Sequence, residues 1–437
     1  MAKVSLVSLI FFLSINVIYS EPILKIPFKV ESTSSFFPNQ SDPVTNKYMS
    51  QMVSELSLGE PSQKLNCSLN LMSYHSLFLT HKIQNFELTS FYNKSQSSTY
   101  ICKKELSEYS NEDFNKAETF SEKIQIFSSE NRKIFDEDLN FLLIDDLAQD
   151  EQNEFYAPGQ IGLKLDAHNV NSYPKNENFI TQIKNKRITR NSIFTFEFND
   201  EKNGNFIIGK DVYHNNNYLK LSIKSTEWSL NFDKIFYGKK EIEESDHAII
   251  QTENGLIVGT IDYKDIIYKE FFSKQKNCYM NKTKMGYHLF NYFYCDEDFD
   301  ETKMENLTFY FSIRRKDINF TFTGKDLFFM ENGKKYFKII FFTFPNYIWY
   351  FGRAFLQKYQ LFFDTDRKII YVKYNDDFSF ISYFNDVDFW TILSLIAALL
   401  SIILYVIAYP KRNKRKRRKN EIDDEQNMNE NNVELLN

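Results

Sequence analysis

The stretch HAIIQTENGLIVGT, residues 247–260, constrains the fold more than any other part of the chain. Two short apolar runs, at residues 248–250 and 256–258, enclose a polar loop at residues 251–255. Apolar runs of this length, bounded by polar and glycine positions, are typical of buried strands. The pattern therefore predicts two strands that hold the side chains of one short polar loop at the rim of a core.

Short apolar or alternating runs recur along the rest of the chain, and helical periodicity is rare between residues 47 and 388. Hydrophobic residues make up 43% of the sequence, which excludes a disordered protein. Short strands separated by Asn-, Asp- and Lys-rich turns predict an all-β architecture. The predicted strands include residues 124–127, 141–144, 193–198, 206–209, 307–313 and 336–344, and the predicted helices are residues 178–186 and 263–272.

Two longer apolar segments lie near the ends of the chain. Residues 1–20 combine an early lysine, an apolar centre and a small final residue, as a secretory signal peptide does. Residues 389–409 are 21 positions without a charge, enough for a helix to cross a bilayer core of about 30 Å. Acidic residues precede this segment and a basic run, KRNKRKRRKN, follows it. This asymmetry predicts a single-pass type I membrane protein of the secretory or endolysosomal pathway or the cell surface.

A lumenal or extracellular chain meets glycosylation and an oxidising compartment. Six Asn-x-Ser/Thr sequons lie between the two apolar segments. Asn66 adjoins a cysteine inside a predicted strand, so we expect no glycan there. The candidate glycosylation sites are Asn39, Asn93, Asn281, Asn306 and Asn319, of which we expect only some to be used. The four cysteines would form two disulfides, and the residues alone leave all three connectivities open.

Several kinds of functional site are excluded by the sequence. Six scattered histidines and no paired-cysteine motif leave no metal site, and Gly-rich phosphate loops are absent. The basic run at residues 411–419 abuts the predicted span, so it indicates orientation in a membrane and not nucleic-acid binding. We therefore predict a monomer with a single membrane span, no cofactor, no metal and no nucleic-acid partner.

Several stretches resemble pepsin-like aspartic peptidases, in the order in which that family carries them. The most specific is WYFGRAFLQKYQLFFDTDRKIIYV at residues 349–372. The resemblance implies two β-rich lobes that face a cleft, so the predicted fold is an all-β bilobal pepsin-like fold with one C-terminal transmembrane helix. The other stretches are LSLGEPSQ with the CSLNLMSYHSLFLT that follows it, FYNKSQSSTY, the segment that begins at Tyr109, GQIGL, GNFIIGKD, the hairpin after Trp228 and residues 247–260.

The same resemblance divides the chain and pairs its cysteines. It implies a second-lobe disulfide between Cys278 and Cys295, which leaves Cys67 to pair with Cys102. The predicted divisions are a signal peptide (1–20), an N-terminal segment (21–46), an N-terminal lobe (47–213), a C-terminal lobe (214–376), a juxtamembrane linker (377–388), a transmembrane helix (389–409) and a cytoplasmic tail (410–437).

The residues that this family uses for catalysis are replaced. Asn70 and Gln251 stand at the positions of the catalytic Asp pair, and Glu253 stands where the second loop has glycine. Aspartic peptidases need two carboxylates that share one proton, and side-chain amides cannot accept a proton from water near neutral pH. The resemblance also places Ser73 and Thr252 in the two loops. Tyr109 falls at the family's flap tyrosine.

The sequence therefore predicts a membrane glycoprotein whose pepsin-like ectodomain is catalytically inactive and binds peptides or proteins. Two alternatives stay open. One is an active membrane-anchored aspartic endopeptidase with displaced acids, for which Glu253 is a candidate that still lacks a second carboxylate. The other is a structural surface glycoprotein that uses the fold as a scaffold.

Overall fold

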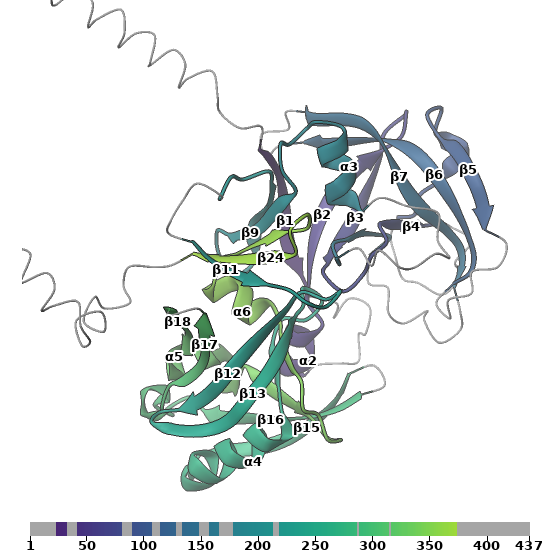
Figure 1. The fold of residues 1–437 in the computed structure, drawn as a ribbon. Coiled ribbons are helices and arrows are strands. Elements are labelled where there is room, and N and C mark those ends of the chain that lie inside the picture. The colour runs from purple at the N-terminus through teal and green to yellow at the C-terminus, as the bar shows by residue number, and fades with distance from the viewer. Residues whose placement is uncertain are drawn as a thin grey trace, which may run out of the picture. The chain divides into compact units, whose positions relative to one another are not determined.

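The computed structural model describes residues 23–32, 42–80, 90–106, 114–127, 133–147, 157–165, 178–212, 218–285, 288–313 and 316–373. These residues belong to one compact unit that ends at Lys373 (Figure 1). The predicted signal peptide, the predicted span, Asn39 and Tyr109 lie outside the described residues. No helix among the described residues combines the length and the apolar character needed to cross a bilayer.

Most of the described residues form two large sheets (Figure 1). In order of pairing, the first sheet contains β11 (Tyr218–Ser222), β24 (Ile369–Lys373), β23 (Leu361–Asp364), β9 (Ile193–Phe198), β10 (Asn203–Ile208), β1 (Leu24–Glu31), β2 (Gln51–Leu58), β3 (Gln63–Asn70), β8 (Gly159–Gly162), β4 (Leu77–Leu79), β7 (Lys133–Leu147), β6 (Phe114–Phe127) and β5 (Ile101–Leu106). The second contains β18 (Lys316–Phe322), β17 (Leu307–Ile313), β12 (Ser229–Tyr237), β13 (Lys240–Ile250), β22 (Trp349–Phe351), β14 (Ile257–Gly259), β21 (Ile339–Phe342), β16 (His288–Asp296), β20 (Lys334–Phe337) and β19 (Phe328–Glu331), with β15 (Cys278–Met285) beside β16. The all-β prediction is confirmed.

Helices are few and short, and both predicted helical segments form. The side chain of Asn178 accepts a hydrogen bond from the Ile180 amide at the start of α3, and Thr260 accepts one from the Tyr263 amide at the start of α4. These caps satisfy amides that a helix leaves without a partner in its first turn. The helices are α2 (Pro43–Tyr48), α3 (Phe179–Asn185), α4 (Ile261–Glu270), α5 (Gly324–Leu327) and α6 (Arg353–Lys358), and the 3-10 turns are η2 (Lys94–Gln96), η3 (Phe272–Lys274) and η4 (Glu301–Lys303).

The two sheets repeat one arrangement of four strands. In the first, β8 lies between β3 and β4, parallel to β3 and antiparallel to β4, and β7 runs parallel to β4 on its other side. In the second, β22 lies between β13 and β14 with the same directions, and β21 runs parallel to β14. All three residues of β4 and of β14 are buried, so side chains on both faces of each strand are covered. This explains why their sequences are continuous apolar runs.

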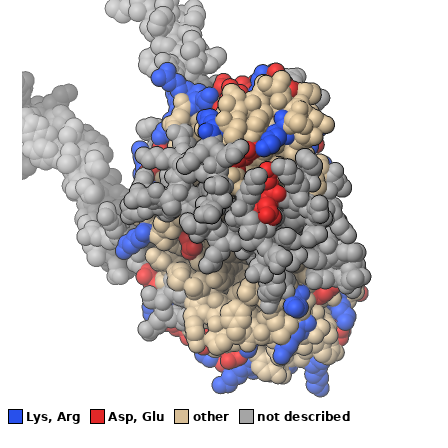
Figure 2. All heavy atoms as spheres, turned by 90° about the vertical axis from the view of Figure 1, so that its right-hand side faces the viewer, with Lys and Arg blue, Asp and Glu red and all other residues tan. Residues whose placement is uncertain are grey.

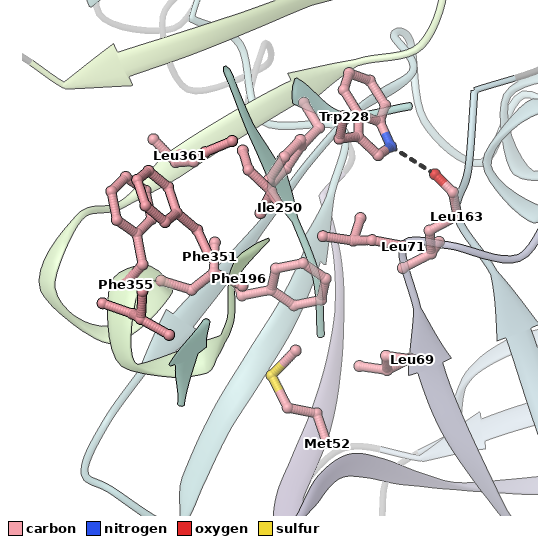
Figure 3. Packing of buried hydrophobic residues seen from close by; sticks show 14 of the residues in the cluster. Met52, Leu69, Leu71, Leu163, Phe196, Trp228, Ile250, Phe351, Phe355 and Leu361 are labelled. Atoms are coloured by element: carbon pink, nitrogen blue, oxygen red, sulfur yellow. Dashed lines mark hydrogen bonds between the residues drawn. The ribbon is translucent and has the colours of Figure 1, made fainter. Parts of the chain in front are cut away.

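A shared apolar core lies beneath the ends of β3 and β13. It contains Leu71, which follows β3, and Ile250, the last residue of β13 (Figure 3). Trp228 is fully buried between these groups, and its indole N–H donates a hydrogen bond of 2.8 Å to the carbonyl oxygen of Leu163 (Figure 3). Since Leu163 follows β8 and Trp228 precedes β12, this bond joins the crossing strand of the first sheet to the second sheet.

One predicted disulfide forms and the other does not. Cys278 and Cys295 lie opposite each other on β15 and β16 and are joined. The pairing of Cys67 with Cys102 is wrong, because both are free thiols. Cys67 lies on β3, which pairs with β2 and β8, whereas Cys102 lies on β5, which pairs with β6. The strands that carry the two thiols are therefore not neighbours in the sheet.

The two free thiols should differ in reactivity. Burial raises the pKa of the Cys67 thiol, and a thiol reacts through its thiolate. A thiol reagent should therefore label exposed Cys102 in the native protein and label Cys67 only after unfolding without reductant. Peptide mapping checks this and should find Cys278 still joined to Cys295. A disulfide at Cys67 would contradict the strand order described above.

Candidate functional site

The two loops that hold Asn70 and Gln251 leave β3 and β13 at equivalent points. Asn70 is the last residue of β3, and its carbonyl accepts a hydrogen bond of 2.8 Å from the Leu163 amide. Gln251 follows the last residue of β13, and its amide donates one of 2.9 Å to the Phe351 carbonyl. Each loop is thus held by the strand that crosses behind it, β8 or β22.

Gly162 is the last residue of β8 and Gly352 directly follows β22, and the loops pass very close to both glycines. A Cβ atom at Gly162 would lie 2.6 Å from the carbonyl of His75, and one at Gly352 would lie 2.0 Å from the carbonyl of Leu256. No side chain fits against backbone at these distances. The lack of a side chain at these two glycines therefore allows each loop to lie directly against its crossing strand.

The Asn70 side chain makes three hydrogen bonds, all to residues of its own loop or of β8. Its oxygen accepts bonds from the amides of Met72 (2.7 Å) and Ser73 (2.8 Å). Its amide nitrogen donates to the side-chain oxygen of Gln160 at 2.8 Å. Hydrogen bonds to both its oxygen and its nitrogen therefore fix the orientation of the Asn70 side chain. The partnership with Gln160 was not predicted from the sequence.

In the second loop, the Gln251 side-chain oxygen accepts a hydrogen bond from the side-chain amide of Asn254. The amide of Arg353, directly after Gly352, donates to the Asn254 carbonyl at 2.9 Å. The last residue of α2 also holds this loop, because the Gly255 amide donates to the Tyr48 carbonyl at 2.8 Å. Gln251 therefore belongs to a network of neutral amides.

The two loops contact each other through Thr252. Its hydroxyl oxygen accepts a hydrogen bond of 3.0 Å from the Leu71 amide, and both residues are buried. Leu71 has no hydroxyl with which to return a bond. The connection at this point therefore consists of one buried hydrogen bond between the loops.

Glu253 adds a second connection between the loops. One of its carboxylate oxygens accepts a hydrogen bond from the Met72 amide at 3.1 Å, and the other accepts one from the Thr252 amide at 2.8 Å. Burial is the largest effect on this carboxyl group and raises its pKa, while these hydrogen bonds and the ammonium group of Lys164 act in the opposite direction. The Glu253 carboxylate therefore lies between the two loops and accepts a hydrogen bond from each of them.

Comparison with known families identifies this arrangement. The model of the family "Eukaryotic aspartyl protease" matches residues 51–372, which includes both loops and both crossing strands. The chain belongs to the eukaryotic aspartyl protease family. None of the curated proteins compared with the chain matches it.

Membership of the aspartyl protease family gives the loops a clear chemical meaning. The two loops are where an aspartyl protease holds two carboxylates that share a proton. In this chain, the two loops carry the side-chain amides of Asn70 and Gln251, and the carboxylate of Glu253 accepts hydrogen bonds from backbone amides of both loops. The strongest influences on its pKa are burial, those hydrogen bonds and Lys164, and none of them is a second carboxylate.

Charged and aromatic groups flank the loops of this aspartyl protease domain. The ammonium group of Lys164 lies 4.9 Å from the centre of the Tyr74 ring and 3.4 Å from a carboxylate oxygen of Glu227. The hydrogen bonds between Ser73 and His75 in the structure involve the main chain of His75. Burial lowers the pKa of the His75 imidazole to about 4. Within the described ranges, no group of three or more His, Cys, Asp or Glu residues is placed to hold a metal ion.

Thr252→Val should destabilise the protein, because it leaves the buried Leu71 amide without its acceptor. We expect a loss of about 1–3 kcal/mol in the free energy of unfolding, the usual cost of an unsatisfied buried polar group. Urea denaturation measures it. Thr252→Ser keeps the hydroxyl and is the matched control, which should lose much less. Equal midpoints for the wild type and Thr252→Val would refute the role of this bond.

Glu253 should make stability depend on pH. A carboxyl group whose pKa is raised on folding stabilises the native state below its ordinary pKa, and this contribution is lost as the pH rises through the raised value. Glu253→Gln should remove this part of the pH dependence in denaturation curves recorded at a series of pH values. Glu55→Gln, at an exposed glutamate of β2, is the control. Identical slopes for the wild type and Glu253→Gln would show that Glu253 does not titrate in this way.

Proposed function

We propose that this aspartyl protease domain is catalytically inactive and acts by binding peptides or proteins. The observation that carries the proposal is the state of the two amides at the catalytic positions. Asn70 uses its oxygen for two backbone amides and its nitrogen for Gln160, and Gln251 accepts from Asn254. These hydrogen bonds keep the loops in order without either carboxylate of the catalytic pair.

The chemistry of the amides supports inactivity. The reaction needs one group that removes a proton from water and a second that polarises the scissile carbonyl. An amide oxygen is too weak a base for the first task, and losing a positioned acid–base group typically costs about 10²–10⁴ in rate. Groups that act as one unit fail together, so replacing both leaves little of the rate enhancement.

An active endopeptidase is the second candidate, and Glu253 is the observation in its favour. This carboxylate lies between the loops, and burial raises its pKa, as a general acid requires. Its two oxygens already accept hydrogen bonds from Met72 and Thr252. A second carboxylate within hydrogen-bond reach would also be needed. The proposal of an inactive domain therefore explains more of these hydrogen bonds than the proposal of an active endopeptidase does.

The proposal also covers the cellular location and the membrane attachment of the domain. We infer that residues 389–409 anchor it as a type I membrane protein and that its lumenal face carries glycans. The supporting features are the uncharged segment, the basic residues after it, the signal-like first 20 residues and the sequons. A peptide or protein ligand would then be met in the secretory or endolysosomal pathway or at the cell surface.

Restoring the lost groups tests the catalytic part of this proposal. Asn70→Asp or Gln251→Asp alone should give no cleavage of an unfolded protein at acidic to neutral pH, because one carboxylate cannot form the proton-sharing pair. The double replacement should recover little, since Glu253 still occupies the space between the loops and would shift the pKa of a new carboxylate. Adding Met72→Gly and Glu253→Gly should give the most active variant.

The matched control carries Met72→Gly and Glu253→Gly without either aspartate, and it should stay inactive. Cleavage is followed by mass spectrometry with and without pepstatin. Pepstatin-sensitive cleavage by the unmodified protein would overturn the inactive reading and favour the active endopeptidase.

Sequon use should follow exposure of the asparagine. Asn306 is exposed just before β17, whereas Asn319 lies on β18 with its side-chain oxygen buried. Asn306→Gln should therefore reduce the mass of the secreted-pathway protein by one glycan, and Asn319→Gln should leave it unchanged. Gel mobility before and after enzymatic removal of N-glycans checks this. A protein whose mass responds to neither deglycosylation nor these substitutions would contradict the proposed lumenal topology.

A further inference from the structure

Four aromatic rings form a row across neighbouring strands of the second sheet, which we call the tyrosine row. It consists of Tyr279 on β15, Tyr294 on β16, Tyr336 on β20 and Phe329 on β19, each paired with the next in the sheet. The centres of successive rings are 5.3, 5.9 and 5.4 Å apart. Since side chains opposite each other on paired strands lie on one face, the row belongs to a single face of the sheet.

The tyrosine row is most exposed at its β15 end. Tyr336 is buried and Tyr294 is partly buried, whereas Tyr279 is 46% exposed. Among the described strands, β15 pairs with β16 alone, so Tyr279 lies at an edge of the sheet. Exposed edges with large apolar side chains favour unwanted association. A group that covers Tyr279 would therefore protect this edge.

A glycosylation sequon lies beside Tyr279 on the same face of β15. Residues 281–283 read Asn-Lys-Thr, and Asn281 is exposed. Side chains two positions apart on a strand share a face and are about 7 Å apart. The side-chain amide of Asn281 donates to the Tyr292 hydroxyl at 3.1 Å, and the Tyr292 ring lies 6.2 Å from that of Tyr294. These contacts place Asn281 next to the tyrosine row.

Hydrogen bonds fix the orientation of the Asn281 side chain. Its oxygen accepts a bond from the Lys282 amide at 2.8 Å. Its nitrogen carries two hydrogens, of which one points to Tyr292 and the other is the position that an N-linked sugar takes. The Tyr292 hydroxyl donates in turn to a carboxylate oxygen of Asp42 at 3.3 Å. The atom that would carry a sugar is therefore held beside the tyrosine row.

The segment α2 covers β15 on the other side of Asn281. The hydroxyl oxygens of Thr45 and Thr283 lie 2.8 Å apart, and Thr283 is two residues after Asn281 on the same face. A sugar on Asn281 therefore meets α2 in one direction along the strand and the exposed ring of Tyr279 in the other. The open direction leads to Tyr279.

We propose that Asn281 carries an N-linked glycan whose first N-acetylglucosamine packs on the Tyr279 ring and covers the exposed end of the tyrosine row. This rests on the proposed lumenal location of the domain. One side of such a sugar presents C–H groups, which are attracted to the electron-rich face of an aromatic ring. The side of the molecule that carries β15 in Figure 1 faces the viewer in Figure 2, and its lower part is mostly uncharged. A neutral sugar suits a surface of this kind.

The test uses the full-length protein, made in a eukaryotic secretory host and purified in lipid nanodiscs. Glycopeptide mass spectrometry measures the occupancy of each sequon. Thermal denaturation midpoints are compared for the wild type, Asn281→Gln, Tyr279→Ser and the double variant. Asn306→Gln is the control for loss of a glycan elsewhere. Tyr268→Ser, at a 49% exposed tyrosine of α4, is the control for loss of an exposed ring.

We expect Asn281→Gln and Tyr279→Ser each to lower the midpoint by about 2 °C. The double variant should lower it no further, because both substitutions remove the same contact. The two control variants should shift it much less. An endoglycosidase that leaves one N-acetylglucosamine on Asn281 should keep the wild-type midpoint, since the first sugar makes the contact. A trimmed protein as unstable as Asn281→Gln would overturn the role of that sugar.

Other results would overturn the proposal in different ways. Additive losses in the double variant would show that the glycan and the ring act independently. A glycan at Asn306 with none at Asn281 would overturn this inference and leave the lumenal topology standing, whereas a protein without a glycan at any sequon would overturn both. Sedimentation velocity asks whether a second copy of the chain covers Tyr279. A wild-type dimer that Tyr279→Ser converts to a monomer would replace the glycan as the covering group.

Discussion

The close meeting of the two loops after β3 and β13 is the constraint on which the rest of the structure depends. Each loop is hydrogen-bonded to a crossing strand that ends in glycine, and the Leu71 amide reaches the Thr252 hydroxyl between them. In the shared core beneath, Trp228 donates to the Leu163 carbonyl and so joins the end of β8 to the start of β12 in the second sheet. The backbone hydrogen bonds to the crossing strands and the bond to the Thr252 hydroxyl do not require a carboxylate at Asn70 or Gln251.

Under the proposed function, these contacts would explain how the family's fold persists with the amides of Asn70 and Gln251 in place of a catalytic pair of carboxylates. Asn70 still accepts hydrogen bonds from the amides two and three residues later, so the first loop keeps its turn. The Glu253 carboxylate accepts a hydrogen bond from the Met72 backbone amide across the two loops. The Glu253 side chain thus contributes a contact between the loops.

Many of the strands and helices could be predicted from the sequence, because the patterns that indicate them are local. The apolar runs on either side of residues 251–255 become the end of β13 and β14. Residues 178–186 contain α3, and residues 263–272 overlap all but the first two residues of α4. What the sequence did not reveal depends on long-range pairing. The partnership of Asn70 with Gln160 joins residues 90 positions apart. The error over Cys67 has the same origin, since the strand order that separates β3 from β5 is set by pairings far along the chain.

Another feature that sequence reasoning missed is the buried charge of Arg353, which follows the glycine of the second crossing strand. Its guanidinium donates to the carbonyl and the hydroxyl of Ser50, before β2, and burial lowers its pKa to about 10. In sequence, an arginine in this place resembles an exposed helix residue. Its role becomes visible only when the segment around α2 packs against the second lobe.

The most direct test of the central claim is to search for any product of catalysis. The purified full-length protein would be incubated with a mixture of natural peptides across acidic to neutral pH, and new peptide termini would be identified by mass spectrometry. The account predicts that the wild type yields no more new termini than a Glu253→Gln/Asn70→Ala variant. New termini that appear with the wild type and vanish in that variant would show that these loops still perform hydrolysis, and would contradict it.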